Sequence, residues 1–335
     1  MQLINKSALI RLAILFAVLL VVFLGAWLIM FRMPGQSYQG QLPPLQREDV
    51  AMQNSLQEDV RHIAVEIGAR NVERYEKLDA TRIFLETALT QAGYVVKRQE
   101  YQIEGKPCYN LEVERLGTDK PKEIVVIGGH YDSAFTSPGA NDNGTGVAAT
   151  LELARIFAQK PTKRTIRFVE FVNEEPPFFW TEAMGSLVYA KRSHQKGENI
   201  VAMLSLETMG YFSDAVGSQK YPPPLNLFYP DQGNFIGFIG NFNSGDLVRS
   251  TLASFRNHVE FPSQGASLPA WMPGVGWSDH WAFWQQGYKG IMITDTAPFR
   301  YPQYHTGEDT IDKIDFDKFA RVVAGLVEVI SDLTE

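Results

Sequence analysis

The amino-acid sequence predicts an α/β domain, in which helices cover both faces of a sheet, preceded by one transmembrane helix. Short apolar runs at 123–129, 165–172 and 200–206 recur along the chain, and helical or irregular segments separate them. These runs do not alternate cleanly between apolar and polar residues, which is typical of strands buried on both faces. A single uncharged stretch of membrane-spanning length lies close to the N-terminus.

Residues 12–31 form the predicted membrane helix. Their sequence, LAILFAVLLVVFLGAWLIMF, contains no charged residue, and about 20 apolar residues suffice to cross a bilayer as a helix. Lys6 and Arg11 precede this stretch and no small-residue cleavage site follows it, which favours an uncleaved signal anchor over a removed signal peptide. We therefore expect a single-pass membrane protein with residues 1–11 in the cytoplasm and the bulk of the chain on the extracytoplasmic side, periplasmic or extracellular.

The remaining elements follow in order along the chain. Residues 32–47 are polar and rich in proline and glycine, which predicts a linker, and 48–335 is expected to be one domain. Apolar residues recur at helical spacing over 48–68 and over 78–92, which predicts two opening helices. An edge strand within 92–103 is expected next. The predicted inner strands are the runs at 123–129, 165–172, 200–206 and 290–296.

Composition excludes several classes of function. The chain of 335 residues has 45% hydrophobic and 21% charged residues, which is typical of a globular protein. Its net charge of -7 and its lack of a basic stripe argue against a nucleic-acid partner. The single cysteine, Cys108, excludes an internal disulfide and a thiolate zinc site. H-E-x-x-H, G-x-S-x-G and G-K-[ST] motifs are absent, which argues against serine hydrolases and nucleotide enzymes.

Two adjacent carboxylates, Glu174 and Glu175, stand where the run 165–172 ends. Pro176 and Pro177 forbid a helix directly after them, so both acids lie at the carboxyl end of a strand. Neighbouring carboxylates repel each other, and partial burial increases the repulsion unless a cation or a shared proton relieves it. A solvated loop with two surface acids is the alternative interpretation of the pair alone.

Further potential ligands follow the other predicted inner strands. Carboxyl ends of strands in an open α/β sheet form one edge, where sites assemble, so these residues are expected to converge. Singly, each has a structural explanation as a core histidine, a helix cap or a loop residue. Together, two histidines and several carboxylates form a ligand set that suits zinc and tolerates manganese or cobalt, typical of a catalytic metal. The residues are His130, Asp142, Glu207 and His305, with Asp132 placed to fix the His130 tautomer.

At this point the chain resembles metallopeptidase family 28, the co-catalytic zinc aminopeptidases and their relatives. The segments that carry the resemblance stand in the family's order over residues 60–330: GGHYDS, PGANDNGTGVAATLELAR, FVNEE followed by MGS, LETMGYF, SDHWAFW and YHTGEDT. The resemblance implies a three-layer sandwich, in which helices flank a mixed, mostly parallel eight-stranded sheet. It also implies peptide substrates and two zinc ions per chain, and it leaves the oligomeric state open.

The resemblance also implies roles for the candidate ligands. One zinc ion would bind His130 and Glu207, and the other would bind Glu175 and His305. Asp142 would bridge the two ions. The best-known members of the family carry aspartate where this chain has Glu207, and the extra methylene is expected to weaken the metal at that position.

The two adjacent glutamates receive different roles from the same resemblance, since Glu174 would be the general base. Along an extended chain, neighbouring side chains point to opposite sides, so Glu174 and Glu175 need not make the same contact. Coordination neutralises Glu175 and removes the repulsion. Glu174 then stays free to take a proton from water and to deliver it to the leaving amine.

Three features remain outside this ligand set. Asp279 and His280 are expected near the site without binding metal. The aromatic residues 178–180 are either part of a pocket or, more commonly for such clusters, ordinary packing.

The predicted function is that of a membrane-anchored zinc exopeptidase of the aminopeptidase type. A glutaminyl cyclase and a catalytically inactive, receptor-like ectodomain are the alternatives, and the presence of the whole ligand set with its base favours hydrolysis.

Overall fold

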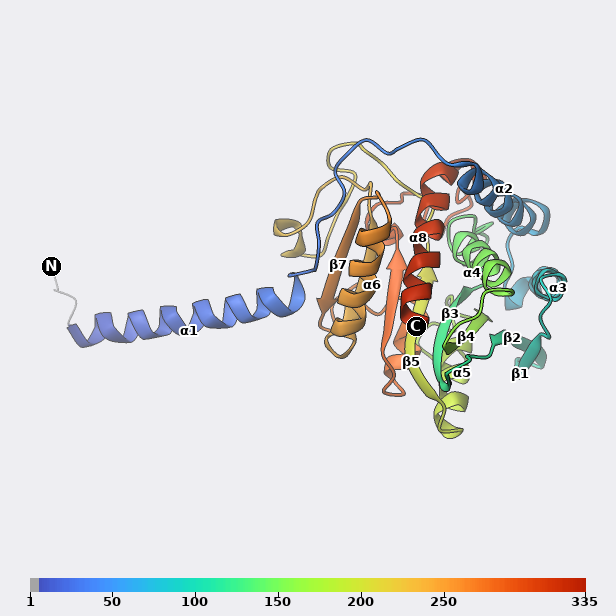
Figure 1. Cartoon of the computed structure of the whole chain (residues 1–335), viewed down its shortest axis with the longest axis horizontal. Coiled ribbons are helices and arrows are strands. Elements are labelled where there is room, and N and C mark those ends of the chain that lie inside the picture. Colours follow the sequence, from blue (N-terminus) through green and yellow to red (C-terminus); the bar gives the residue numbers. More distant parts are fainter. Residues whose placement is uncertain (1–5) are drawn as a thin grey trace.

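An eight-stranded sheet runs through the centre of the domain in the order β1-β2-β4-β3-β5-β8-β6-β7 (Figure 1). The structure is a computed structural model, and it describes residues 6–335. Neighbouring strands from β4 through β3 and β5 to β8 pair in parallel, as do β6 and β7, whereas the β1–β2, β2–β4 and β6–β8 pairs are antiparallel. The strands are β1 (Lys97–Ile103), β2 (Lys106–Arg115), β3 (Lys120–His130), β4 (Arg164–Phe171), β5 (Asn199–Glu207), β6 (Ile236–Asn241), β7 (Ser263–Leu268) and β8 (Gly290–Thr294).

Helices cover both faces of this sheet, so the predicted three-layer architecture is confirmed. Helices α4, α6 and α8 lie on one face, and α2 packs outside α4 and α8, while α5 and α7 lie on the other face. The bounds are α1 (Lys6–Met30), α2 (Arg47–Arg61), α3 (Tyr75–Gln91), α4 (Gly144–Phe157), α5 (Gly185–Gln195), α6 (Gly245–His258), α7 (His280–Trp284) and α8 (Phe316–Thr334).

Burial on both faces explains why the inner strands read as continuous apolar runs. In β3, Val125 and Ile127 join the core beneath α4, whereas Ile124 and Val126 pack towards α5 and α7. A strand buried on one face only would place polar residues at every second position. The apolar and polar residues therefore do not alternate because helices cover both faces of the sheet.

Five of the strands correspond to runs predicted from the residues, and three do not. Strands β1 and β8 lie within the expected segments, β3, β4 and β5 overlap theirs and extend one to three residues beyond them, and β1 is an edge strand. Strand β2, KPCYNLEVER, carries four charged residues, and β6 and β7 are only six residues long and contain glycine or serine. Short, polar or glycine-bearing strands lack the β-branched and aromatic enrichment by which strands are recognised.

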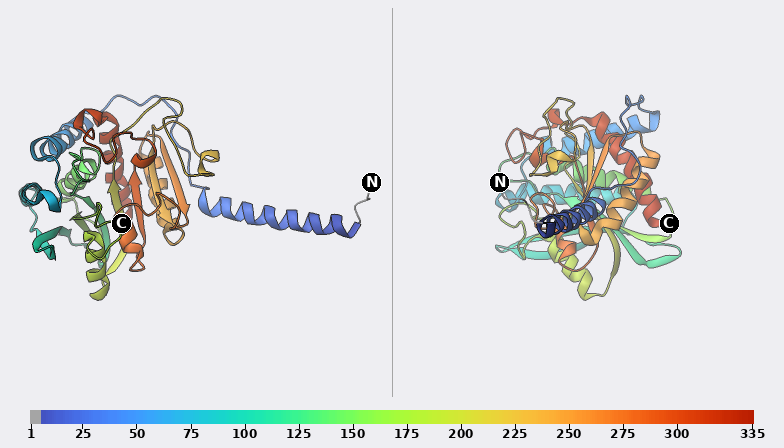
Figure 2. Two further views of the ribbon diagram at one scale, coloured as in Figure 1. Left: turned by 180° about the vertical axis from the view of Figure 1, so that it is seen from behind. Right: turned by 90° about the vertical axis from the view of Figure 1, so that its left-hand side faces the viewer.

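Helix α1 extends away from the domain (Figures 1 and 2) and has no buried residue. It is long and apolar enough to cross a membrane, a test that a signal sequence near the N-terminus also passes. It includes residues 12–30 of the predicted anchor, and residues 1–5 of the predicted cytoplasmic segment lie outside the described part of the chain.

The segment between α1 and α2 runs along the domain surface. It contains no helix or strand over 32–46. The Arg256 guanidinium on α6 donates to the Pro34 carbonyl at 2.8 Å, and the Ser263 N–H on β7 donates to the Ser37 hydroxyl at 3.0 Å. The predicted linker therefore contacts the sheet's outer end before it reaches α2.

Candidate metal centre

Three neighbouring strands deliver polar side chains to one edge of the sheet. Strand β3 ends at His130 and β5 ends at Glu207, while β4 ends at Phe171, shortly before Glu174 and Glu175. These strands are adjacent in the order β4-β3-β5 and run parallel, so their carboxyl ends meet. The convergence predicted for an open α/β sheet is thus realised in the fold.

Two loops bring in the remaining candidates, Asp142 before α4 and His305 after β8. The backbone N–H groups of Asn141 and Asp142 donate to the two carboxylate oxygens of Asp309, at 2.8 and 3.0 Å. The Asn143 side chain caps α4 by accepting from the backbone of its first turn. The Asp142 loop is thereby fixed from both sides, by the loop after β8 and by the helix that follows it.

The candidate ligands form two groups that share Asp142. The His130 Nε2 atom lies 3.5 Å from Asp142 Oδ1 and 3.3 Å from Glu207 Oε2. The His305 Nε2 atom lies 3.0 Å from Asp142 Oδ2 and 3.1 Å from Glu175 Oε2. Within each group one donor atom per residue lies within 4.8 Å of the others. The two oxygens of Asp142 therefore face different imidazoles, each with its own second carboxylate.

The donor atoms in this centre lack ordinary hydrogen-bond partners. Buried atoms without a partner include the Nε2 atoms of His130 and His305, Asp142 Oδ2 and Glu175 Oε1. Buried polar atoms are nearly always satisfied, because an unsatisfied one costs about 1–3 kcal/mol. Four such atoms converging on one place fit metal ligation, and nitrogen and carboxylate oxygen are the donors that zinc takes in catalytic sites.

Burial makes the centre strongly unfavourable for uncompensated negative charge. It raises the pKa of Glu174 well above its usual value. Burial, with the Asp142 charge added, raises the pKa of Glu175 to about 8. Burial lowers the pKa of His305, but the adjacent carboxylates of Asp142 and Glu175 outweigh it and raise the pKa to about 11. Protons or cations must therefore balance the carboxylates, and divalent ions do so without protonating a ligand.

Asp132 contacts both the imidazole of His130, as predicted, and the backbone of the glutamate pair. Its carboxylate accepts the N–H groups of both Glu174 and Glu175, at 3.1 and 3.0 Å. The His130 Nδ1 atom lies 3.2 Å from the Asp132 backbone carbonyl and 3.6 Å from its carboxylate. The carbonyl is thus the nearer partner of the imidazole, and the carboxylate holds the backbone of the glutamate pair just after Asn173, whose φ is 61°.

Segment 278–280 reaches the centre through Ser278, which is not among the predicted site residues. The Ser278 hydroxyl donates to Glu207 Oε2 at 2.7 Å and lies 2.8 Å from the Ser205 hydroxyl. Asp279 and His280 are buried beside it, and burial lowers the pKa of His280 to about 4, so its imidazole stays neutral. The serine thereby holds the carboxylate of Glu207 in position.

Arg70 is a second residue that the sequence does not mark. Its fully buried guanidinium donates to the backbone carbonyls of Tyr131, Pro138 and Gly139, at 2.7, 2.6 and 3.0 Å. It therefore joins the segment after His130 to the loop before Asp142. Such a role depends on contacts with residues far away in the sequence, and no local sequence pattern around Arg70 predicts it.

Of the aromatic residues 178–180, Phe179 and Trp180 pack against other aromatic rings, whereas Phe178 lines a cleft. The rings of Phe179 and Trp180 stack at 4.9 Å, and Trp180 stacks on Trp281 at 5.6 Å. The Trp180 indole N–H donates to the Gly276 carbonyl at 3.0 Å. Phe178 lines a separate cleft beside Glu175.

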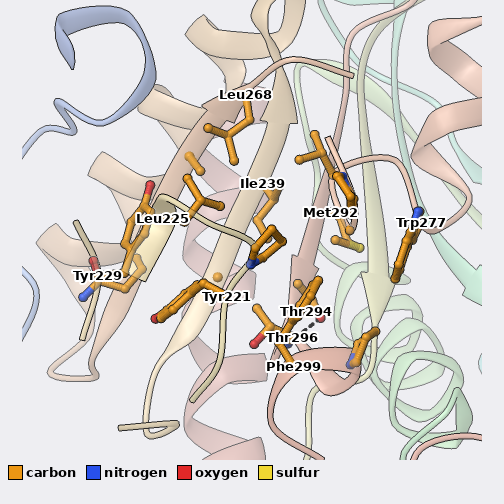
Figure 3. A pocket seen from close by; sticks show the side chains of 18 of the residues that line it. Tyr221, Leu225, Tyr229, Ile239, Leu268, Trp277, Met292, Thr294, Thr296 and Phe299 are labelled. Atoms are coloured by element: carbon orange, nitrogen blue, oxygen red, sulfur yellow. Dashed lines mark hydrogen bonds between the residues drawn. The ribbon is translucent and has the colours of Figure 1, made fainter. Parts of the chain in front are cut away.

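An apolar pocket opens beside the metal centre (Figure 3). Residues from the loops at 219–235, 273–277 and 296–304 line it together with residues of β6, β7 and β8, and the free space measures about 80 Å³. One water needs about 10–15 Å³ of such space, so the pocket has room for one side chain. The candidate ligand Glu207 and the nearby Tyr304 are also among its lining residues. The walls include Tyr221, Leu225, Tyr229, Ile239, Leu268 and Phe299.

Comparison with known proteins shows to which protein family the chain belongs. The model of peptidase family M28 matches residues 110–330. The chain belongs to peptidase family M28. This confirms the resemblance and the prediction of a metallo-exopeptidase type of hydrolase. The uncharacterized protein YfbL of Escherichia coli (strain K12) is 34% identical over 95% of this chain and 98% of its own length. The aminopeptidase YwaD of Bacillus subtilis is 27% identical over 64% of this chain and 44% of its own length.

Solved structures share the M28 fold. The zinc aminopeptidase BSAP of Bacillus subtilis superposes with a TM-score of 0.69 at 13% identity, over 84% of this chain and 95% of that one. A glutaminyl cyclase of Bacteroides thetaiotaomicron superposes with a TM-score of 0.64 at 19% identity, over 87% of this chain and 99% of that one. The fold alone is therefore common to hydrolases and cyclases.

Ser278 provides a test of how Glu207 is positioned. Ser278→Ala removes the hydrogen bond to Glu207 Oε2, and loss of such a partner typically costs 10- to 100-fold in metal affinity. We expect zinc bound beside His130 and Glu207 to be released at a lower chelator concentration, while the group around His305 keeps its affinity. Chelator titration with metal analysis measures both.

Ser250→Ala is the matched control, because its hydroxyl bonds to the Leu247 carbonyl on α6, away from the centre. This variant should release zinc as the unchanged protein does. A Ser278→Ala protein with the same titration curve as the control would show that Ser278 does not position Glu207.

Proposed function

We propose that this chain is a membrane-anchored zinc aminopeptidase that holds two zinc ions. The observation that carries the proposal is the placement of Asp142, whose two oxygens lie 3.5 and 3.0 Å from the imidazoles of His130 and His305. A carboxylate so placed can bridge two ions, and pairs of metal ions are common in aminopeptidases. Zinc metalloproteases and aminopeptidases among the relatives support the choice of metal and reaction.

The residues divide into two ligand sets around the shared carboxylate. We assign His130 and Glu207 to one ion, and Glu175 and His305 to the other, with Asp142 common to both. Bound zinc would lower the pKa of water and polarise the substrate carbonyl. The chain's own part is to hold these donors rigidly, through Asp309 below Asp142 and Ser278 beside Glu207.

Glu174 is the proposed general base. It belongs to neither ligand group, yet its Oε2 atom lies 3.8 Å from His130 Nε2, at the edge of the centre. The Asp132 carboxylate fixes its backbone, so the side chain has a defined position. Glu174 takes a proton from the attacking water and returns it to the leaving amine, the reciprocal task of a base in peptide hydrolysis.

The apolar pocket suggests which substrates are cleaved. The candidate ligand Glu207 and Tyr304 both line it, so a side chain in it would belong to a residue held next to the metal centre. Room for one side chain between apolar walls favours a large apolar residue at the amino terminus of the peptide. Burial and nearby carboxylates raise the pKa of Tyr304 well above its usual value, so its hydroxyl stays protonated beside the substrate.

The proposed location follows from the N-terminal helix. We assign 1–11 to the cytoplasm, 12–31 to a signal anchor, 32–47 to a linker and 48–335 to the catalytic domain, on the periplasmic or extracellular side. Lys6 and Arg11 on the short N-terminal flank favour this orientation. The protein should remain in membranes after washing at high pH, and external protease should reach the domain. Recovery in the soluble fraction would contradict the anchor.

The adjacent glutamates test the mechanism, because one is proposed to move a proton and the other to hold zinc. Glu174→Gln keeps the size of the side chain but removes the base. Its zinc content should equal that of the unchanged protein, while kcat for leucine and phenylalanine p-nitroanilides falls by about 10² to 10⁴. Glu175→Gln should lose zinc, since an amide is a poorer ligand, and added zinc should restore part of the activity.

Glu182→Gln is the control, because this exposed glutamate pairs only with Lys191 near the surface. It should leave kcat and zinc content unchanged. Reversed effects of the Glu174 and Glu175 substitutions would exchange their roles. Cyclisation of N-terminal glutamine without hydrolysis would indicate a glutaminyl cyclase instead. Absence of turnover on every aminoacyl and glutaminyl substrate would favour the receptor-like alternative.

A further inference from the structure

The segment that joins helix α1 to the domain packs against the outside of the apolar pocket. We call residues 30–33 the juxtamembrane segment. The Phe31 ring stacks on the Phe228 ring with centroids 4.3 Å apart, and it meets the edge of Tyr229 at 6.0 Å. A Cβ atom on Gly265 would stand 3.1 Å from the Met33 side chain, so glycine at this position leaves room for Met33.

The residues touched by this segment are themselves walls of the pocket. Tyr229 and Gly265 both line it, and the Tyr229 hydroxyl donates to the Gly265 carbonyl at 2.8 Å. Tyr221, also a wall residue, stacks on Tyr229 at 5.7 Å. One layer of aromatic side chains therefore separates the juxtamembrane segment from the space where a substrate side chain would lie.

Two arginines of α6 hold the segment in place. The Arg249 guanidinium donates to the Ile29 carbonyl at 2.6 Å, and Arg256 donates to the Pro34 carbonyl at 2.8 Å. The segment is thus tied down on either side of Phe31. By contrast, the wall loop carrying Phe228 and Tyr229 has only the three-residue helix Leu225–Leu227 as regular structure. Support for this loop comes from its packing partners, and Phe31 is one of them.

We propose that Phe31 is a positioning residue for the pocket, so that the membrane anchor helps to set the preference for a large apolar side chain. The inference rests on the proposed function in so far as the pocket receives the substrate's amino-terminal residue. Loss of the Phe31 ring would let the side chains of Phe228 and Tyr229 move more freely. The pocket would then become wider or less well defined on this side. Glu174 and the metal ligands come from other elements, so turnover of a bound substrate should not change.

The inference predicts a selective change in KM for the full-length protein in lipid nanodiscs. For Phe31→Ala, KM for phenylalanine p-nitroanilide should rise about two- to tenfold, the usual worth of one aromatic pair. The kcat for that substrate, and both constants for alanine p-nitroanilide, should stay unchanged, because a methyl group does not reach the wall. Phe31→Tyr, which keeps the ring, should behave as the unchanged protein does.

Phe23→Ala is the matched control, since Phe23 is an exposed phenylalanine within α1, distant from the pocket along the same helix. It should change neither substrate. Phe228→Ala should raise KM like Phe31→Ala, and the double variant should add little to either single change, because both remove the same contact. An unchanged ratio of the two KM values in Phe31→Ala would overturn the inference.

Calorimetric binding of phenylalaninol and alaninol separates this inference from the proposed function. Neither compound is hydrolysed, so the pocket is read without turnover. Phe31→Ala should bind phenylalaninol about two- to tenfold more weakly than the unchanged protein. If Phe31→Ala weakened phenylalaninol binding in this way but the protein cleaved no aminoacyl substrate, the proposed aminopeptidase activity would be refuted. The proposed effect of Phe31 on the pocket would still stand. Equal or absent phenylalaninol binding in both proteins would refute the coupling.

Discussion

The centre depends on one carboxylate that must face two imidazoles at once. Asp142 achieves this because the loop that carries it is fixed from several directions: Asp309 accepts its backbone N–H, and Arg70 donates to the carbonyls of the preceding loop. A carboxylate on a free loop would turn towards water. Buried here, Asp142 instead brings His130, from the end of β3, and His305, from the loop after β8, into one charged cluster, which a pair of divalent cations can neutralise.

The same sheet that carries the candidate ligands also forms part of the apolar pocket. Helices α5 and α7 cover the second face near β2, β5 and β8, whereas loops line the pocket together with β6, β7 and β8. Glu207 and Tyr304 are among the lining residues, so the candidate metal centre and the proposed substrate pocket adjoin each other. Because the loops lack a helical layer, their packing against neighbours, the juxtamembrane residue Phe31 included, gains importance for the shape of the pocket.

Much of the fold and the candidate cluster could be predicted from the sequence. Buried parallel strands appear in the sequence as continuous apolar runs, and the ends of such runs are easily found. His130 and Glu207 directly follow such runs, and Asp142 sits in a glycine-rich loop before an amphipathic helix. The short strands β6 and β7 do not contain a continuous apolar run of this kind. The sequence does not mark the supporting contacts for a related reason. Ser278 and Arg70 act through contacts far along the chain, and Asp132 uses its carboxylate on the glutamate backbone while its carbonyl faces His130.

The most direct test of the account is anomalous X-ray scattering from crystals of the zinc-loaded protein, measured on both sides of the zinc absorption edge. The account predicts two zinc peaks, one on each side of Asp142, separated by about 3.5–4 Å as in other two-metal sites. One peak should lie beside His130 and Glu207, and the other beside Glu175 and His305. A single peak at full activity, or two peaks that do not share Asp142, would contradict the account.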